Sequence, residues 1–318
     1  MLELGEEWIW DSWYLHDGSQ WHCWFLKAPR SLGDPALRHW NVTHGHATST
    51  DLRNWTYHGT AFAPSATPSW DDYTTWTGSV VRGDDDAWHY FYTGTSRAEN
   101  GKIQRIGHAT GTDLESWQRV GNGLCLDISG PAARLYETEW EGRWHDRSLR
   151  DPWVMRNPDG NGWLMYFTAR SSQMQDTRDA GCIGLATSPD LHTWELQPPA
   201  FVGGWGELEV PQVFQAGDKW FCLFCMSSWH QSDRNRASMG VSGRGNHFLV
   251  ADHPLGPWQL ADGPALDVAD ERYAARILDH DGLQIIGFKD GEPDGFGGYL
   301  MDPQTVSIDP ERGLVLED

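Results

Sequence analysis

The sequence is poor in basic residues and in long apolar runs. It has 24 lysine and arginine residues against 45 aspartate and glutamate residues, which gives a formal net charge of −21. Nucleic acids and anionic membrane surfaces bind to basic faces, so this balance argues against both as partners. No apolar stretch approaches the roughly 18 residues that a membrane-spanning helix needs. The composition thus excludes two classes of partner and leaves the function open.

Cysteine is scarce as well. The five cysteines are an odd number in a long chain, which predicts reduced thiols and no disulfide framework. Cys222 and Cys225 have the spacing of half a zinc or redox site, but they lie in an apolar strand pattern, and no second pair follows. Because residues three apart on a strand point to opposite faces, we expect both in the core. The first residues, MLELGEEWIW, lack the basic and apolar regions of a signal peptide, so we expect a cytoplasmic protein, or a secreted one whose leader was removed.

The sequence also lacks segments with helical periodicity. Instead, one short sequence motif occurs four times along the chain. The repeated segments are GHATSTDLRNW ending at Trp55, GHATGTDLESW ending at Trp117, GLATSPDLHTW ending at Trp194 and the degenerate LVADHPLGPW ending at Trp258. Each reads as a short strand, a tight turn built on Asp-Leu, and a tryptophan that opens the next strand. Such a repeat indicates a radial or solenoid array of small sheets.

A pair of strands joined by a turn precedes each copy, and a fifth pair follows the last one. The turns carry HDG, GDDD, NPDGNG, AGD and HDG, which are typical of hairpins. The fifth pair leads into GYLMDPQTVSID instead of a copy of the tryptophan motif. Five units of about four strands predict an all-β fold, a five-bladed β-propeller that forms a single domain over residues 1–318. We expect a strand from one end of the chain to complete the last blade.

The first strand of each unit lines the central channel of a propeller. Near the starts of these strands the five units present Asp11, Trp76 with Ser79, Arg150 with Asp151, Glu209, and the region of Tyr273. Three carboxylates therefore converge at one end of the channel. Like charges repel in a partly dry site, so a purely structural role would gain nothing from them. Cleavage of a glycosidic bond, in contrast, requires paired carboxylates.

The motifs on these inner strands resemble those of a known group of enzymes. WDSW, WTGS, RDP and LEVPQVF are similar to motifs of the five-bladed propeller glycosidases and glycosyltransferases, which include levansucrases, invertases and fructanases and, more distantly, arabinanases and xylosidases. The resemblance covers nearly the whole chain. It implies a retaining glycoside hydrolase that acts on β-fructofuranosides such as sucrose or fructo-oligosaccharides, with some transfer to acceptor sugars and no cofactor.

The resemblance also implies roles for the three acids: Asp11 as nucleophile, Asp151 as stabiliser of the transition state and Glu209 as acid/base. Anionic neighbours favour an oxocarbenium-like transition state and raise the pKa of a nearby acid, which suits these roles. Glu207 is the rival acid, because it lies two residues before Glu209 and points to the same strand face. Glu209 is favoured because Pro211 follows it at the spacing of the group.

Two departures from this group concern the substrate. Val210 stands where levansucrases usually carry arginine. The Asn-Asp-Pro-Asn-Gly motif and the second, β-sandwich domain of invertases have no counterpart in the sequence. The chain fits neither branch cleanly, so the exact sugar, the linkage and the substrate length stay open.

Several residues around the acids are candidates for binding the sugar. Trp10 and Trp76 offer flat faces for stacking, and Ser79 and Arg150 lie near the starts of inner strands. The connection over residues 27–46 is long and rich in hydrogen-bonding side chains, which is typical of loops that shape pockets. The candidates within it are Arg30, His39 and Asn41.

Metal sites are not expected. His44 and His46 have no third ligand at suitable spacing, which argues against zinc. The segments GDDDAW at 83–88 and NPDGNG at 157–162 are similar to calcium loops, but hairpin turns account for both.

Two other functions remain open. One is an inverting α-L-arabinofuranosidase or β-xylosidase, in which the same three carboxylates act as base, modulator and acid. The other is a propeller that binds carbohydrate or protein without turnover, and the convergent acids argue against it. The oligomeric state is not indicated by the sequence.

Overall fold

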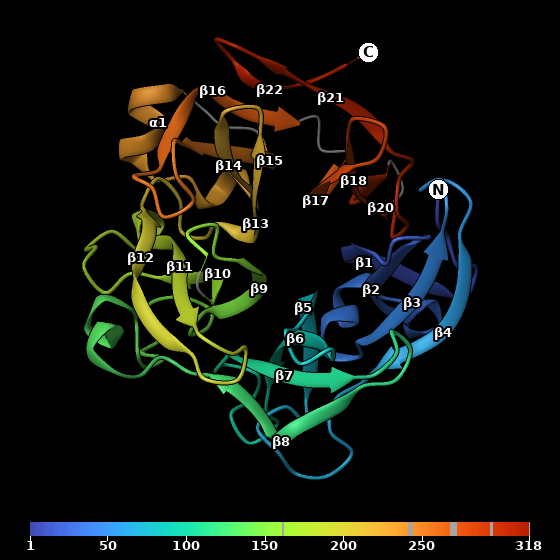
Figure 1. Cartoon of the computed structure of the whole chain (residues 1–318). Helices are drawn as coiled ribbons and strands as arrows, with labels where there is room; N and C mark the ends of the chain where they lie inside the picture. Colours follow the sequence, from blue (N-terminus) through green and yellow to red (C-terminus); the bar gives the residue numbers. More distant parts are fainter. Residues whose placement is uncertain (161, 241–243, 268–271, 293–294, 318) are drawn as a thin grey trace.

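The computed structural model describes the chain except for residues 161, 241–243, 268–271, 293–294 and 318. Five four-stranded antiparallel sheets are arranged around a central axis, so the predicted five-bladed propeller is confirmed (Figure 1). Two further short strands, β19 (Gly291–Glu292) and β20 (Gly295–Phe296), pair with each other after β18. In each blade the strands follow one another from the centre outward, as hairpin turns between neighbouring strands dictate. The first blade contains β1 (Glu7–His16), β2 (Trp21–Pro29), β3 (Thr43–Ser49) and β4 (Thr56–Phe62).

The other four blades repeat this order. The second contains β5 (Thr74–Arg82), β6 (Trp88–Thr95), β7 (Arg105–Gly111) and β8 (Gln118–Leu126). The third contains β9 (Leu149–Arg156), β10 (Trp163–Arg170), β11 (Gly181–Ser188) and β12 (Glu195–Val202). The fourth contains β13 (Glu209–Ala216), β14 (Lys219–Met226), β15 (Gly245–Ala251) and β16 (Gln259–Asp267). The fifth contains β17 (Arg272–Asp279), β18 (Leu283–Lys289), β21 (Gln304–Asp309) and β22 (Gly313–Leu316).

Strands from the C-terminal end complete the fifth blade, and the two ends of the described chain lie in neighbouring blades (Figure 1). Leu2 and Leu300 exchange backbone hydrogen bonds of 3.0 and 2.9 Å. The amide of Ile9 in β1 donates to the carbonyl of Gly298 at 2.9 Å. These bonds join the first blade to the fifth and close the ring.

The repeated Asp-Leu turns form as the sequence predicts. Asp51 accepts the backbone amides of Arg53 and Asn54 through Oδ1, and Asp190 does the same in the third blade. The leucine that follows each aspartate has a positive φ, 59° at Leu52 and 67° at Leu191. The aspartate side chain thus replaces backbone partners in a turn that would otherwise favour glycine.

The hydrophobic core is divided among the interfaces between blades. Separate clusters of buried residues lie between the second and third, the third and fourth, and the fourth and fifth blades, and a larger one joins the first blade to both neighbours. All five cysteines are free. Cys222 and Cys225 are buried in two different clusters, which confirms that they point to opposite faces of β14.

Helical structure is short. The helix α1 (Asp233–Met239) lies between β14 and β15, and 3-10 turns include Arg30–Leu32 and Pro35–Trp40 between β2 and β3. Seven residues are too few for an apolar period to register in the sequence, which explains why α1 was not expected. No helix in the described part of the chain has the length and apolar character needed to span a bilayer.

Candidate active site

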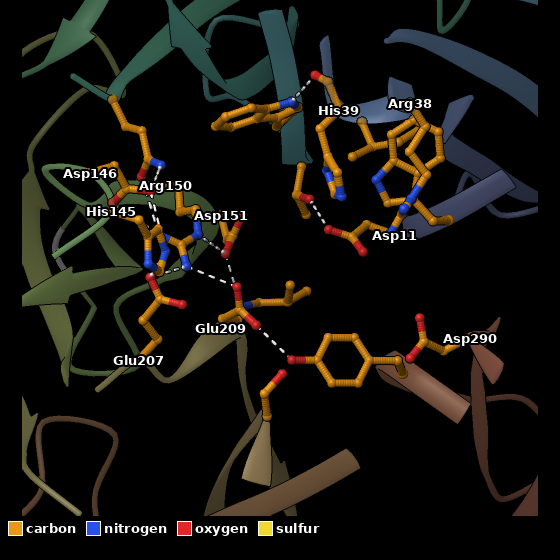
Figure 2. Close-up of a pocket in the computed structure, with 18 of the residues that line it drawn as sticks. Asp11, Arg38, His39, His145, Asp146, Arg150, Asp151, Glu207, Glu209 and Asp290 are labelled. Carbon is orange, nitrogen blue, oxygen red and sulfur yellow. Dashed lines mark hydrogen bonds and ion pairs between the residues drawn. The ribbon is translucent and has the colours of Figure 1, made fainter. Parts of the chain in front are cut away.

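A cavity of about 600 Å³ opens at the end of the channel where the innermost strands begin. All five blades contribute to its lining (Figure 2). The residues supplied by the innermost strands are Trp10, Asp11, Trp76, Thr77, Arg150, Asp151, Glu209, Val210 and Tyr273. The predicted convergence of Asp11, Asp151 and Glu209 in one cavity is therefore what the structure shows.

A β-bulge in each innermost strand aims these residues into the cavity. The register shifts at Asp11 in β1 and at Thr77 in β5, and similar shifts interrupt β9, β13 and β17. Asp151 and Val210 at two of the bulges have φ values of 57° and 53°, and a β-branched residue such as valine rarely adopts this conformation. Bulges at the rim of a sheet commonly redirect a side chain next to an active site. The bulge in each of the five innermost strands thus directs side chains from every blade toward the same cavity.

Asp11 lies between the first two blades. Its Oδ2 accepts a hydrogen bond of 2.5 Å from the Thr77 hydroxyl. Burial raises the pKa of Asp11 above its usual value, the hydrogen bond from Thr77 lowers it, and the negative charge of Glu209 raises it further. Thr77 therefore favours the ionised form that a nucleophile needs.

Asp151 lines the cavity but is almost fully buried. Its Oδ2 accepts hydrogen bonds from the Thr168 hydroxyl at 3.0 Å and from the Val210 amide at 3.1 Å. Burial raises the pKa of Asp151 to about 7; the Arg150 guanidinium opposes this, and the charges of Asp11 and Glu209 add to it. Asp151 is thus fixed in orientation, and its charge is costly in the folded protein.

Glu209 is more accessible than Asp151, with 23% of its side chain exposed against 4%. Its Oε1 accepts a 2.8 Å hydrogen bond from Arg150, and its Oε2 accepts a 2.6 Å hydrogen bond from the Tyr273 hydroxyl (Figure 2). These two donors, from the third and fifth blades, hold the carboxyl group toward the cavity. An accessible carboxyl held in this way is suited to exchange a proton with a substrate oxygen.

Glu207 also lines the cavity, but its surroundings differ. It is 1% exposed, and its Oε1 lies 2.9 Å from Trp144 Nε1 and 3.0 Å from both His145 Nε2 and an Arg150 nitrogen. Despite its burial, the positive charge of Arg150 and the hydrogen bond from His145 hold its pKa well below the usual range. A carboxyl group that stays ionised is a poor proton donor, which supports Glu209 over Glu207, and the choice between them stays a prediction.

Four of the seven predicted sugar-binding residues line the cavity: Trp10, His39, Trp76 and Arg150. The indole Nε1 of Trp76 donates to the carbonyl of His39 at 3.0 Å. This bond attaches the connection between β2 and β3 to the second blade, so that the loop covers one side of the cavity.

The other three, Ser79, Arg30 and Asn41, do not line it, and these assignments are corrected. Ser79 lies deeper along β5, and its hydroxyl accepts the Val154 amide at 3.2 Å, which ties the second blade to the third. Arg30 donates to the carbonyl of Glu7, outside the cavity. Asn41 is exposed, and its amide donates to a backbone carbonyl within the preceding 3-10 turn.

Several lining residues were not anticipated. They include Arg38, Lys102, Gln104, His145, Asp146, Trp229, His230, Arg244 and Asp290. Most come from long connections at the same end of the propeller as residues 27–46, between β6 and β7, β8 and β9, and β14 and β15. The length of these connections, compared with the tight hairpins at the other end, is the sequence signal that would have found them.

The raised pKa of Asp151 leads to a prediction about stability. Between about pH 4 and pH 7 the folded protein retains a proton on Asp151 that the unfolded chain releases, so this residue makes stability fall as the pH rises. Asp151→Asn removes the cost of ionisation. We expect the difference in melting temperature, variant minus wild type, to be a few degrees larger at pH 8 than at pH 4. Differential scanning calorimetry at both pH values measures this, and an equal offset at the two would contradict it.

Comparison with known proteins agrees with this geometry. Residues 12–288 match the model of the glycosyl hydrolases family 32 N-terminal domain. An extracellular sucrase of Zymomonas mobilis is 26% identical over 363 residues, covering 97% of this chain and 79% of the sucrase. An invertase of Wickerhamomyces anomalus is 24% identical over 274 residues, covering 82% of this chain and 44% of the invertase.

Solved structures share the fold. An inulosucrase from Halalkalicoccus jeotgali bound to kestose superimposes with a TM-score of 0.80 at 23% identity, covering 99% of this chain and 90% of that one. A levansucrase from Gluconacetobacter diazotrophicus gives a TM-score of 0.76 at 17% identity, covering 100% and 82%. At this identity the likeness establishes the propeller alone. The sequence match over most of the chain goes further, and this protein belongs to glycosyl hydrolase family 32.

Proposed function

We propose that this protein is a retaining β-fructofuranosidase that releases terminal fructose from sucrose or short fructo-oligosaccharides. Membership of family 32 makes it a glycoside hydrolase acting on fructosides. The observation that carries the proposal further is the meeting of Asp11, Asp151 and Glu209 in one cavity, from three different blades. The sucrase and invertase among its relatives are consistent with sucrose as a substrate.

In the proposed first step, Asp11 attacks the anomeric carbon of fructose and Glu209 protonates the oxygen of the departing sugar. The bond from Asp11 forms as the glycosidic bond breaks, and the proton leaves Glu209 with the departing alcohol. Tyr273 and Arg150 stabilise the glutamate anion that results, because both donate hydrogen bonds to it.

Asp151 is proposed to act on the sugar ring rather than on the broken bond. Buried beside Thr168, it presents an oriented acceptor to hydroxyl groups of the fructosyl unit. Above its pKa of about 7 the carboxylate carries a negative charge, which stabilises the positive charge that develops on the ring in the transition state.

In the second step, water deprotonated by Glu209 attacks the fructosyl-enzyme ester and regenerates Asp11. Any sugar hydroxyl bound at the same place can replace the water, which yields fructosyl transfer. The loops that surround the cavity present tryptophans for such an acceptor, including Trp40 and the exposed Trp229.

A substrate panel tests this assignment. Sucrose, a short fructo-oligosaccharide, an aryl arabinofuranoside and an aryl xyloside are incubated with the protein, and the products are separated by chromatography. We expect fructose from the first two alone, and NMR should show the first-formed anomer with retained configuration. Cleavage of an arabinoside without release of fructose would contradict the proposal, and an inverted first product would contradict the nucleophilic role of Asp11.

A further inference from the structure

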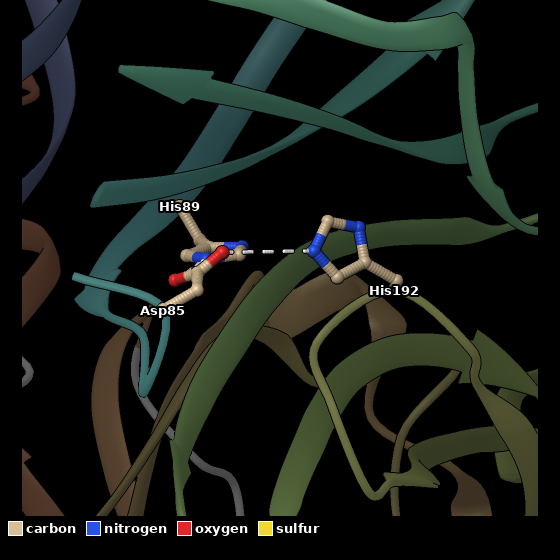
Figure 3. A group of neighbouring side chains, drawn as sticks. All are labelled: Asp85, His89 and His192. Carbon is tan, nitrogen blue, oxygen red and sulfur yellow. Dashed lines mark hydrogen bonds and ion pairs between the residues drawn. The ribbon is translucent and has the colours of Figure 1, made fainter. Parts of the chain in front are cut away.

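A second cluster of chemically active side chains lies between the second and third blades, away from the cavity. Asp85 is in the turn between β5 and β6, His89 is in β6, and His192 is in the turn between β11 and β12 (Figure 3). One ligand atom from each lies within 4.8 Å of the others. The cluster lies beyond the end of β5, whereas Trp76 and Thr77 near its beginning line the cavity. It is therefore separate from the catalytic site.

The distances within the cluster are close to those of a metal site. Asp85 Oδ1 lies 3.0 Å from His89 Nε2, and Asp85 Oδ2 lies 3.9 Å from His192 Nε2. Tetrahedral zinc with bonds of about 2.0 to 2.1 Å separates its ligand atoms by about 3.3 Å. The two separations from Asp85 lie on either side of this value, and the two histidine nitrogens lie within 4.8 Å of each other.

The buried histidine of the cluster is held in place by a neighbour. His89 Nδ1 lies 2.9 Å from His108 Nε2, and the two rings are stacked with an interplanar angle of 15°. Metal-binding histidines usually have their second ring nitrogen fixed in this way. His108 thus fixes the ring of His89 with its Nε2 toward Asp85.

The first blade contains the same arrangement without the third ligand. Asp17, His22 and His46 occupy the equivalent turn and strands, with His22 bonded to Asp17 at 3.1 Å and to His46 at 2.9 Å. At the place of His192 in the repeat, the second blade has Glu115, which is exposed. The Asp-His-His chain is thus a feature of the repeat, and His192 is what distinguishes the cluster between the second and third blades.

We propose that Asp85, His89 and His192 bind a divalent transition-metal ion, zinc above all, and that this ion links the second blade to the third. Two imidazoles and a carboxylate are ligands that zinc accepts. The side chains of Asp85 and His192 are 51% and 43% exposed, which leaves an entry path and a fourth position for water. The turn at residues 83–88 is the expected hairpin, with the Gly83 amide donating to the Ala87 carbonyl at 2.9 Å, and the ion would bind on its outer side.

The test is zinc binding to the full chain after dialysis against a chelator. Isothermal titration with zinc chloride should show a site that is weakened at least 100-fold in His192→Ala. At zinc 100-fold above its dissociation constant, the melting temperature of the wild type should rise by about 4 °C, and that of His192→Ala should not rise. Because His192 is exposed, its replacement should leave the metal-free melting temperature unchanged.

Asp17→Asn and Asp85→Asn form a matched pair of variants. Both remove the acid from an Asp-His-His chain, but only Asp85→Asn should weaken zinc binding. Equal affinity in the wild type and His192→Ala, or no rise in melting temperature at millimolar zinc, would overturn the proposal.

One other group of this kind occurs among the described residues, and it belongs to the cavity: His145, Asp146 and Glu207. Arg150 lies 3.0 Å from Glu207 and 3.9 Å from Asp146, so its charge opposes a cation there. Zinc bound at that place would persist in His192→Ala, which makes the two sites distinguishable.

Discussion

Replacing Asp11 with asparagine should lower kcat on sucrose by about 10⁴-fold or more. An amide cannot form the covalent ester, and among the described residues that line the cavity no other carboxylate shares the contact that Asp11 makes with Thr77. The fold should survive, because asparagine has nearly the same shape and burial already disfavours the charge of Asp11. The measurements are initial rates of fructose release and the melting temperature of the variant at the same pH.

Asp290→Asn is the matched control for this substitution. Asp290 also lines the cavity, but it comes from the segment after β18 and pairs with Arg244. We expect this variant to change KM more than kcat, because its carboxylate is not at a bulge of an innermost strand. A loss of kcat in Asp290→Asn that equals the loss in Asp11→Asn would remove the special role of Asp11. So would normal turnover in Asp11→Asn.

The propeller and its three acids could be predicted because they depend on repetition. The Asp-Leu turn and its tryptophan recur in three blades, with a degenerate copy in the fourth, and radial symmetry then brings the starts of the inner strands together. The position of an acid in the first half of its inner strand, as at Asp11 in β1 and Glu209 in β13, was enough to place it in the channel.

The bulges could not be predicted, because their residues carry no backbone signal. Positive φ is expected of glycine or asparagine, whereas the structure has it at Asp151, Val210 and Ala274. The strain at Val210, about 1 to 3 kcal/mol, is held by bonds from the two neighbouring blades: its amide donates to Asp151, and its carbonyl accepts from Arg276. The bulge at Thr77 also changes which later residues of β5 face the cavity. A sequence analysis that assumes regular alternation along the strand therefore placed Ser79 in the cavity incorrectly.

The loop residues were only partly predictable for a related reason. The connection over residues 27–46 was identified from its length, and His39 from it lines the cavity, but Arg30 and Asn41 do not. Which side chains face inward depends on the 3-10 turns within the loop and on the bond from Trp76 that fixes it. These are tertiary contacts that a local pattern does not encode.

Glu209→Gln should separate acid catalysis from the rest of the mechanism. We expect kcat on sucrose to fall by about 10² to 10⁴-fold, because the departing glucose then leaves without a proton. With β-fructosyl fluoride the loss should be much smaller, since fluoride needs no protonation to leave. The negative charge of Glu209 also raises the pKa of Asp11. Its removal should therefore shift the acid limb of the kcat/KM profile for the fluoride to lower pH.

Glu207→Gln is the control that tests the choice between the two acids. Glu207 contacts Trp144, His145 and Arg150, and Arg150 in turn donates a hydrogen bond to Glu209. Glu207→Gln should therefore make Glu209 less well positioned and lower kcat on sucrose and on the fluoride by similar factors. A loss confined to sucrose in Glu207→Gln, with equal losses on both substrates in Glu209→Gln, would reverse the assignment. The contrast depends on the leaving group alone, so it separates a missing proton donor from general damage to the cavity.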